Sequence, residues 1–147
     1  MKNETNNFRY LEWKSPEEMH FSSVEWISEL NFIKDEHSFF EDMLKEYTMP
    51  IIESHLTEKV TGLIERLSSS TQYAEKLYND IQQHINGLEI MLDGKDEIEK
   101  ETKYKEEHRN LLTEFYKFSR NYNRLKKEIF KTVSEALKYQ KQKRLLK

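Results

Sequence analysis

Histidines are the residues of this chain whose types and spacing are best suited to chemistry. Of five in the sequence, His37, His84 and His108 fall on the apolar stripes of predicted helices. A buried neutral imidazole needs hydrogen-bond partners and can bind a metal ion. The predicted helix register also brings His20 to the same end of a bundle as His84 and His108, with Glu107 nearby. Iron or zinc bound by His20, His84 and His108 is therefore one hypothesis.

The spacing of these histidines favours a simpler interpretation. Di-iron bundles use a Glu-x-x-His motif on each of two helices and a glutamate from each of two more. Only His20 completes such a motif here, beside a predicted helix start. We therefore expect no cofactor, and we expect His84 and His108 to be polar core residues satisfied by neighbours or water. A metal site and a pH-responsive packing role are the alternatives.

The usual motifs of hydrolytic and acid–base enzymes are missing from the sequence. It has no cysteine, no Gly-x-Ser-x-Gly, no His-Glu-x-x-His and no glycine-rich phosphate loop. With only 3 glycines and 2 prolines it offers few loops on which catalytic residues could sit. Its many carboxylates are expected on solvated helix faces. We expect a protein that is not an enzyme.

Charge is divided unevenly along the chain. Residues 120–147 contain ten basic and two acidic residues, a net of +8, whereas residues 1–119 carry −11. The basic stretch can complement the acidic helices of its own chain, or it can attract an anionic surface or an acidic partner. Sequence-specific DNA binding is not expected, because the chain has no helix-turn-helix and no basic zipper layout. An anion-binding module acting through the last helix is thus an alternative function.

Two segments are candidate contact surfaces for a partner. The N-terminal segment, residues 1–14, is rich in large apolar side chains, and aromatic residues are preferred anchors of interfaces. The end of the last helix combines basic residues with leucines and is expected to project beyond the other helices. The residues concerned are Phe8, Tyr10 and Trp13 in the first segment, and Lys138, Lys141, Lys143 and Arg144 in the second.

Three long apolar stripes define the elements that must position these residues. Side chains recurring alternately three and four positions apart lie on one side of a helix. The stripe residues are Trp26, Leu30, Ile33, His37, Phe40, Leu44 and Tyr47; Leu56, Val60, Leu63, Leu67, Ser70, Ala74, Leu77, Ile81, His84, Leu88 and Met91; and His108, Leu111, Phe115, Phe118, Tyr122, Leu125, Ile129, Thr132, Ala136 and Tyr139. So few glycines and prolines exclude a many-stranded β protein.

Breaks between the stripes are predicted at Thr48-Met49-Pro50 and at Asp93-Gly94. The sequence therefore predicts an all-α fold, an elongated, coiled-coil-like, antiparallel up-down-up bundle of three helices near 16–47, 51–92 and 96–145. The first helix begins either at Pro16, after an N-cap serine, or near residue 23 at a second start signal. We favour Pro16, because Met19 extends the stripe.

A turn at residues 49–50 fixes the predicted register between the first two helices. Residue i of the first helix then lies beside residue 99−i of the second, which places His37 level with Gly62 and Ser70 near the level of Trp26. We expect the missing side chain at Gly62 to make room for the imidazole of His37.

The chain is expected to form one domain, residues 1–147. It has no run of 18 apolar residues and no signal-peptide pattern, so we expect a cytoplasmic protein without a transmembrane helix. The function that the sequence favours is a non-enzymatic helical interaction or assembly protein that contacts a protein partner or a second copy of itself.

Overall fold

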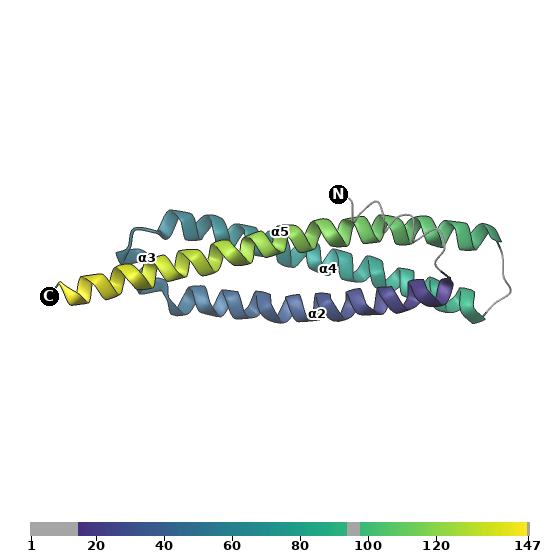
Figure 1. Ribbon diagram of the computed structural model, residues 1–147, viewed down its shortest axis with the longest axis horizontal. Helices are drawn as coiled ribbons and strands as arrows, with labels where there is room; N and C mark the ends of the chain where they lie inside the picture. Colours follow the sequence, from purple (N-terminus) through teal and green to yellow (C-terminus); the bar gives the residue numbers. More distant parts are fainter. Residues whose placement is uncertain (1–14, 94–97, 147) are drawn as a thin grey trace. The chain divides into compact units, whose positions relative to one another are not determined.

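The computed structural model describes residues 15–93 and 98–146 of the chain, and these residues form an all-α fold (Figure 1). The helices are α2 (Pro16–Glu46), α3 (Thr48–Glu53), α4 (Thr57–Asp93) and α5 (Ile98–Leu145). The described residues contain no strand, and the helices pack against one another as a bundle. The predicted fold class is confirmed, whereas the up-down-up order of three helices stays a prediction. No helix among the described residues is long and apolar enough to cross a membrane.

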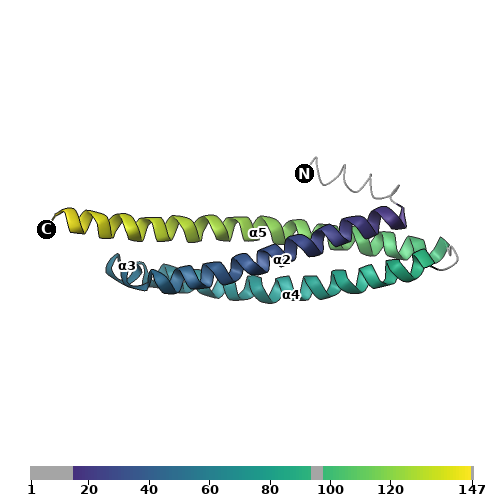
Figure 2. The same cartoon turned by 90° about the horizontal axis from the view of Figure 1, so that it is seen from below.

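Contacts divide the chain into two compact units. Among the described residues, unit 1 contains 15–32, 74–93 and 98–118, and unit 2 contains 33–73 and 119–146. Within each unit, segments of α2, α4 and α5 lie side by side (Figure 1; Figure 2), and α3 belongs to unit 2.

The start of α2 lies where a capping box predicts it. The backbone N–H of Glu18 donates to Ser15 Oγ at 3.2 Å, and the backbone N–H of Ser15 donates to Glu18 Oε1 at 3.4 Å. These two bonds satisfy donors that the first helical turn cannot pair internally. Pro16 lacks such a donor and suits the first helical position. The prediction that this helix begins at Pro16, not near residue 23, is confirmed.

Helix α2 ends at Glu46, close to the predicted break at Thr48-Met49-Pro50, but this break does not lead directly into the second long helix. After Tyr47 the chain forms α3 through Glu53, with the Ile51 N–H donating to the Tyr47 carbonyl at 3.1 Å. Pro50 lies in the first turn of α3, where helical N–H groups have no intrahelical partner, so its missing N–H costs little. The second long helix therefore begins at Thr57 and not at residue 51.

The actual turn between α3 and α4 is a Schellman motif at His55. The N–H of Leu56 donates to the Ile51 carbonyl at 3.0 Å, and the N–H of His55 donates to the Ile52 carbonyl at 3.1 Å. His55 adopts a left-handed conformation with φ of 61°, a position that glycine usually occupies. A histidine there carries no recognisable stop signal, so the sequence did not reveal this turn.

Moving the turn changes the register between α2 and α4. In unit 2, His37 contacts Ser70, eight positions beyond the predicted Gly62. A Cβ atom added at Gly62 would meet no atom within 4 Å, so this glycine does not make room for the imidazole. The prediction about Gly62 is wrong, and so is the prediction that Ser70 lies at the level of Trp26.

The apolar stripes form the core of each unit. Nearly every stripe residue is buried, including polar His37, His84, His108 and Thr132. The exceptions lie at element ends or beside the polar contact of Ser70: Tyr47, Leu56 and Ser70 are half-buried, and Tyr139 is exposed. The periodicity in the sequence therefore predicted the core residues. The buried face of each helix depends on the helical repeat and not on where the turns between helices lie.

Candidate functional site

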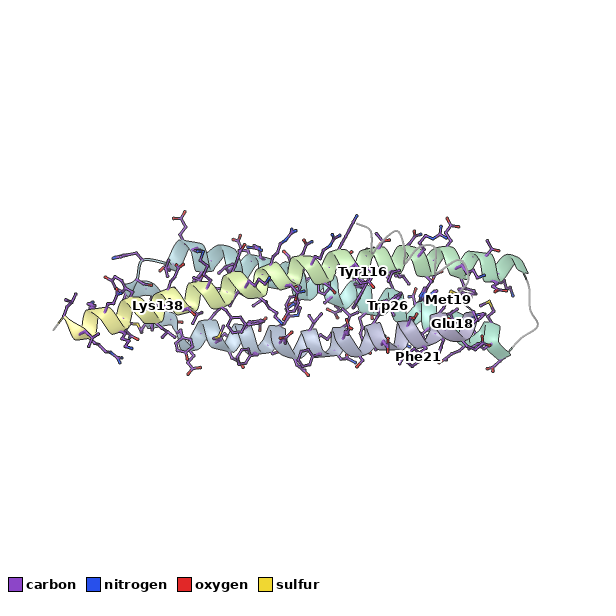
Figure 3. All side chains as sticks on the ribbon, in the orientation of Figure 1. Glu18, Met19, Phe21, Trp26, Tyr116 and Lys138 are labelled. Carbon is purple, nitrogen blue, oxygen red and sulfur yellow. The ribbon has the colours of Figure 1, made fainter. Side chains whose placement is uncertain are left out.

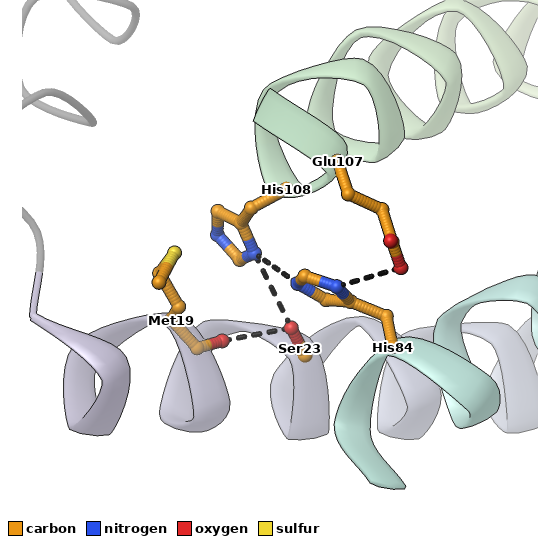
Figure 4. A network of polar contacts seen from close by, with 5 residues as sticks. All are labelled: Met19, Ser23, His84, Glu107 and His108. Carbon is orange, nitrogen blue, oxygen red and sulfur yellow. Dashed lines mark hydrogen bonds and ion pairs between the residues drawn. The ribbon is translucent and has the colours of Figure 1, made fainter. Parts of the chain in front are cut away.

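A chain of polar side chains, buried except for the half-buried Glu107, joins α2, α4 and α5 inside unit 1 (Figure 4). Nδ1 of His84 on α4 lies 3.0 Å from Oε1 of Glu107 on α5. Nε2 of the same ring lies 3.0 Å from Nδ1 of His108, also on α5. Ser23 of α2 completes the network, with its Oγ 3.5 Å from Nδ1 of His108.

One assignment of protons, with both rings neutral, satisfies all of these contacts. Ser23 Oγ donates its hydrogen to the Met19 carbonyl at 2.7 Å, so it can only accept from Nδ1 of His108. His108 therefore carries its proton on Nδ1 and donates it to Nε2 of His84. His84 in turn donates from Nδ1 to the carboxylate of Glu107. Each imidazole is neutral in this arrangement, and the donors point in one direction toward Glu107.

Aromatic rings cover the histidine pair. The ring of Trp26 on α2 stacks on His108, with centroids 4.6 Å apart and an interplanar angle of 23°. The ring centroid of Tyr104 lies 6.1 Å from that of His84, with the two rings tilted by 55°. Both histidines are 0% exposed. The network links α2, α4 and α5 within unit 1 through two imidazoles enclosed among the described residues.

Burial also keeps His84 neutral. Desolvation lowers the pKa of His84, and the attraction and hydrogen bond of Glu107 oppose this shift without overcoming it. An added proton would require His84 to donate from both nitrogens, and His108 would then have to give up its Nδ1 hydrogen. If both rings were protonated, the N–H at Nε2 of His84 and the N–H at Nδ1 of His108 would face each other and repel. Protonation in acid therefore breaks the hydrogen bond between His84 and His108.

His20, the third candidate metal ligand, has a different contact. Its Nε2 lies 3.2 Å from Oε1 of Glu89 on α4, whereas His84 and His108 contact each other. Across residues 15–93 and 98–146, no three His, Cys, Asp or Glu side chains lie close enough together to hold a metal ion. An iron or zinc site formed by His20, His84 and His108 stays a prediction that the described residues do not support.

Unit 2 holds a second polar cluster, which the sequence did not indicate. Tyr122 of α5 donates to Oε1 of Glu36 on α2 at 3.1 Å, and Lys126 Nζ lies 3.0 Å from Oε2 of Glu36. Burial raises the pKa of the Tyr122 hydroxyl, and Glu36 raises it further. The neighbouring His37 packs edge-on against Tyr122 and shares a hydrogen bond of 2.9 Å with Ser70 Oγ. The sequence signal for this cluster was the position of Tyr122 on an apolar stripe, because a buried hydroxyl needs a hydrogen-bond partner.

The basic residues of α5 fall into two groups. Near the middle of unit 2, α5 makes ion pairs with the other helices, namely Lys126 with Glu36 and Glu128 with Arg66. Farther along, residues 138–146, here called the basic segment, are solvent-exposed or nearly so (Figure 3 labels Lys138). None of its four cations, Lys138, Lys141, Lys143 and Arg144, forms an ion pair with another described residue. The predicted self-complementarity accounts for the first group only.

The other predicted contact surface cannot be placed. Phe8, Tyr10 and Trp13 belong to residues 1–14, which lie outside the described residues. The predicted C-cap at Gly94 also lies outside them.

Unit 2 has a groove between α2 and α4, with a volume of about 290 Å³. Its floor consists of the buried side chains of Leu44 and Leu67, and Ile64, which is 50% exposed, forms a wall. The remaining lining residues are Glu41, Lys45, Thr48 and Ser68. We call this feature the α2/α4 groove.

Comparison with known proteins assigns no relative: no family model, no curated protein and no solved structure matches the chain.

Proposed function

We propose that this protein is a non-enzymatic helical assembly protein that associates with a second copy of itself through the basic segment of α5. The observation that carries this proposal is the exposure of Leu145 and Leu146, which are 76% and 89% exposed beside four cations without an ion-pair partner among the described residues. Adjacent exposed leucines flanked by charges are typical of a contact surface.

The energetics favour weak, reversible association. Burying a leucine side chain stabilises a complex by about 1.5–3 kcal/mol, so the two leucines together contribute about 3–6 kcal/mol. Association must also overcome the lost translational and rotational freedom of two copies. Cations near the leucines attract an acidic surface and raise the association rate. We expect a dissociation constant in the high micromolar to millimolar range.

A second copy of the chain offers the complementary charge. The stretch 33–73 of unit 2 carries 4 basic and 8 acidic residues, a net of −4, whereas residues 120–147 carry +8. One copy can therefore present its basic segment to the acidic stretch of another. A hetero-partner with a similar acidic surface would use the same contacts.

Sedimentation velocity of the full chain beside an L145S/L146S variant tests this proposal. Both leucines are exposed, so their replacement should leave the fold and the circular dichroism spectrum unchanged. We expect the wild type to sediment faster as its concentration rises, and the variant to sediment as a monomer throughout. Identical behaviour of the two proteins would contradict a role for these leucines.

A second candidate function is anion binding by the same segment, favoured by the absence of ion-pair partners for its four cations among the described residues. Lys and Arg clustered on one helix attract polyanions at low ionic strength. Retention on heparin should then fall strongly in a K138E/K141E/K143E/R144E variant and little in L145S/L146S. Equal retention of the charge-reversed variant and the wild type would remove this candidate.

A further inference from the structure

The α2/α4 groove has the size and chemistry of a site for apolar side chains. Its volume of about 290 Å³ is just below the range of roughly 300–1,000 Å³ typical of small-molecule sites. Leu44 and Leu67 give it an apolar floor. The hydroxyl of Thr48, the first residue of α3, already donates to the carbonyl of Lys45 on α2 at 2.7 Å. The groove therefore offers mainly hydrophobic contact, with charged groups at its rim.

The basic segment of the same copy cannot reach this groove. Helix α5 continues without a break through Leu145, and both views show its C-terminal part extending past α3 (Figure 1; Figure 2). A continuous helix cannot fold back toward Leu44 and Leu67 without losing its own hydrogen bonds. If leucines of this protein occupy the groove, they belong to another copy.

We propose that the α2/α4 groove of one copy receives Leu145 and Leu146 of a second copy. This inference rests on the proposed assembly function and names the two surfaces that meet. The leucines cover the apolar floor of the groove, and the cations of the basic segment lie on the Glu41 side of its rim.

Charge at the rim supports this occupant and orients it. Glu41 lines the groove and forms no ion pair with another described residue, so its carboxylate is available to a cation such as Arg144. Lys45, one turn away on α2, carries the opposite charge and repels the same cations. The basic segment must therefore enter with its cations on the Glu41 side.

The arrangement closes as a symmetric dimer. Each copy has one groove and one basic segment, both within unit 2, so two copies can exchange their segments reciprocally. Such an isologous contact uses the same patch on both partners and does not propagate into fibres. It also doubles the buried leucines per dimer, which compensates for the small size of each groove.

Disulfide trapping tests the contact directly, because the natural chain contains no cysteine. An S68C copy is mixed with an isotope-labelled L146C copy, in which Leu145 remains, and the mixture is oxidised. A disulfide needs Cβ atoms about 3.5–4.5 Å apart, so only positions in contact are trapped efficiently. The matched control is S69C, an adjacent and equally exposed serine of α4 that does not line the groove. We expect at least about tenfold more mixed disulfide with S68C than with S69C.

The outcomes separate this inference from the proposed function. Equal trapping by S68C and S69C, in a protein whose light-scattering mass still shows association, would overturn the groove contact and leave assembly standing. A monomeric mass at every concentration would overturn both.

Rim charge provides a second test that does not depend on cysteine. E41K should weaken association by about two- to fivefold, and K45E should strengthen it by a similar factor, both effects shrinking at high salt. The same direction of change in both variants would contradict the proposed orientation.

Discussion

Nε2 of His84 faces Nδ1 of His108 at 3.0 Å, so that one hydrogen joins α4 to α5 in the core of unit 1. Because both rings are fully buried, removing one leaves a polar nitrogen of the other without its partner. The two histidines therefore act as a unit. Replacing both should cost less free energy of unfolding than the two single replacements added together.

A double-mutant cycle tests this relationship. H84L and H108L should each lower the free energy of unfolding by about 1–3 kcal/mol, because each leaves a buried nitrogen unsatisfied. The H84L/H108L variant should lose clearly less than the sum of the two single losses, since two apolar side chains need no hydrogen bond. Urea denaturation monitored by circular dichroism gives the three values. Additive losses would show that the two rings are not coupled.

Stability should fall in mild acid. Burial lowers the pKa of both His84 and His37 in the folded protein, so below about pH 6.5 the unfolded chain binds more protons than the folded one. The free energy of unfolding is then highest above pH 6.5. It decreases below that pH by up to about 1.4 kcal/mol per pH unit for each histidine.

Urea denaturation between pH 8 and pH 5 measures this dependence. The H84L/H108L variant should show a shallower decrease, because only His37 of the two shifted groups remains. A stability that stays constant or rises as the pH falls through this range would contradict the neutral, buried state of these imidazoles.

Two helical glycines should respond oppositely to alanine. A Cβ at Gly62 meets open space, so G62A should stabilise the protein by about 1 kcal/mol through better helix propensity. A Cβ at Gly87 would lie 2.6 Å from the ring of Tyr104, which packs on the cluster of Met19, Leu88 and Met91. We therefore expect G87A to destabilise by up to about 2 kcal/mol. Thermal unfolding of the two variants side by side provides the comparison, and equal shifts would count against the packing at Tyr104.

Replacing His55, the left-handed residue at the turn between α3 and α4, with glycine should stabilise the protein. H55G should raise the free energy of unfolding by about 0.5–1 kcal/mol, because glycine adopts a φ of 61° without steric cost. H55A keeps the steric cost and serves as the control. Greater stability of H55A than of H55G in urea would contradict the Schellman motif.

The sequence predicted features that depend on local geometry. The capping box of Ser15 and Glu18, the buried stripes and the general placement of three long helices all follow from helix periodicity and terminal hydrogen bonds. Such signals are repeated along the chain, so an error at one position does not alter the rest.

The turn before α4 was not predictable in the same way. Pro50 is a strong break signal, yet at the third position of α3 it removes only a hydrogen bond that the helix does not make. His55 carries the turn without a glycine. The resulting shift in register moved the partner of His37 on α4 from Gly62 to Ser70.

Side-chain partners in the candidate sites were predicted only in part. His84 and His108 were expected on facing stripes and are in contact. The bond between Tyr122 and Glu36 was missed, because periodicity places side chains on a face but does not say which polar neighbours reach each other. The pairing of His20 with Glu89 was missed for the reason given above, the shifted register of α4.

The molar mass of the full chain in solution shows whether copies of this protein associate through α5. Light scattering across concentrations from about 1 µM to about 1 mM reaches the expected range of dissociation constants. The mass should rise from the 17.9 kDa of one copy toward that of two copies, and it should stay at one copy in L145S/L146S. A wild-type mass of 17.9 kDa at every concentration would contradict self-assembly through α5.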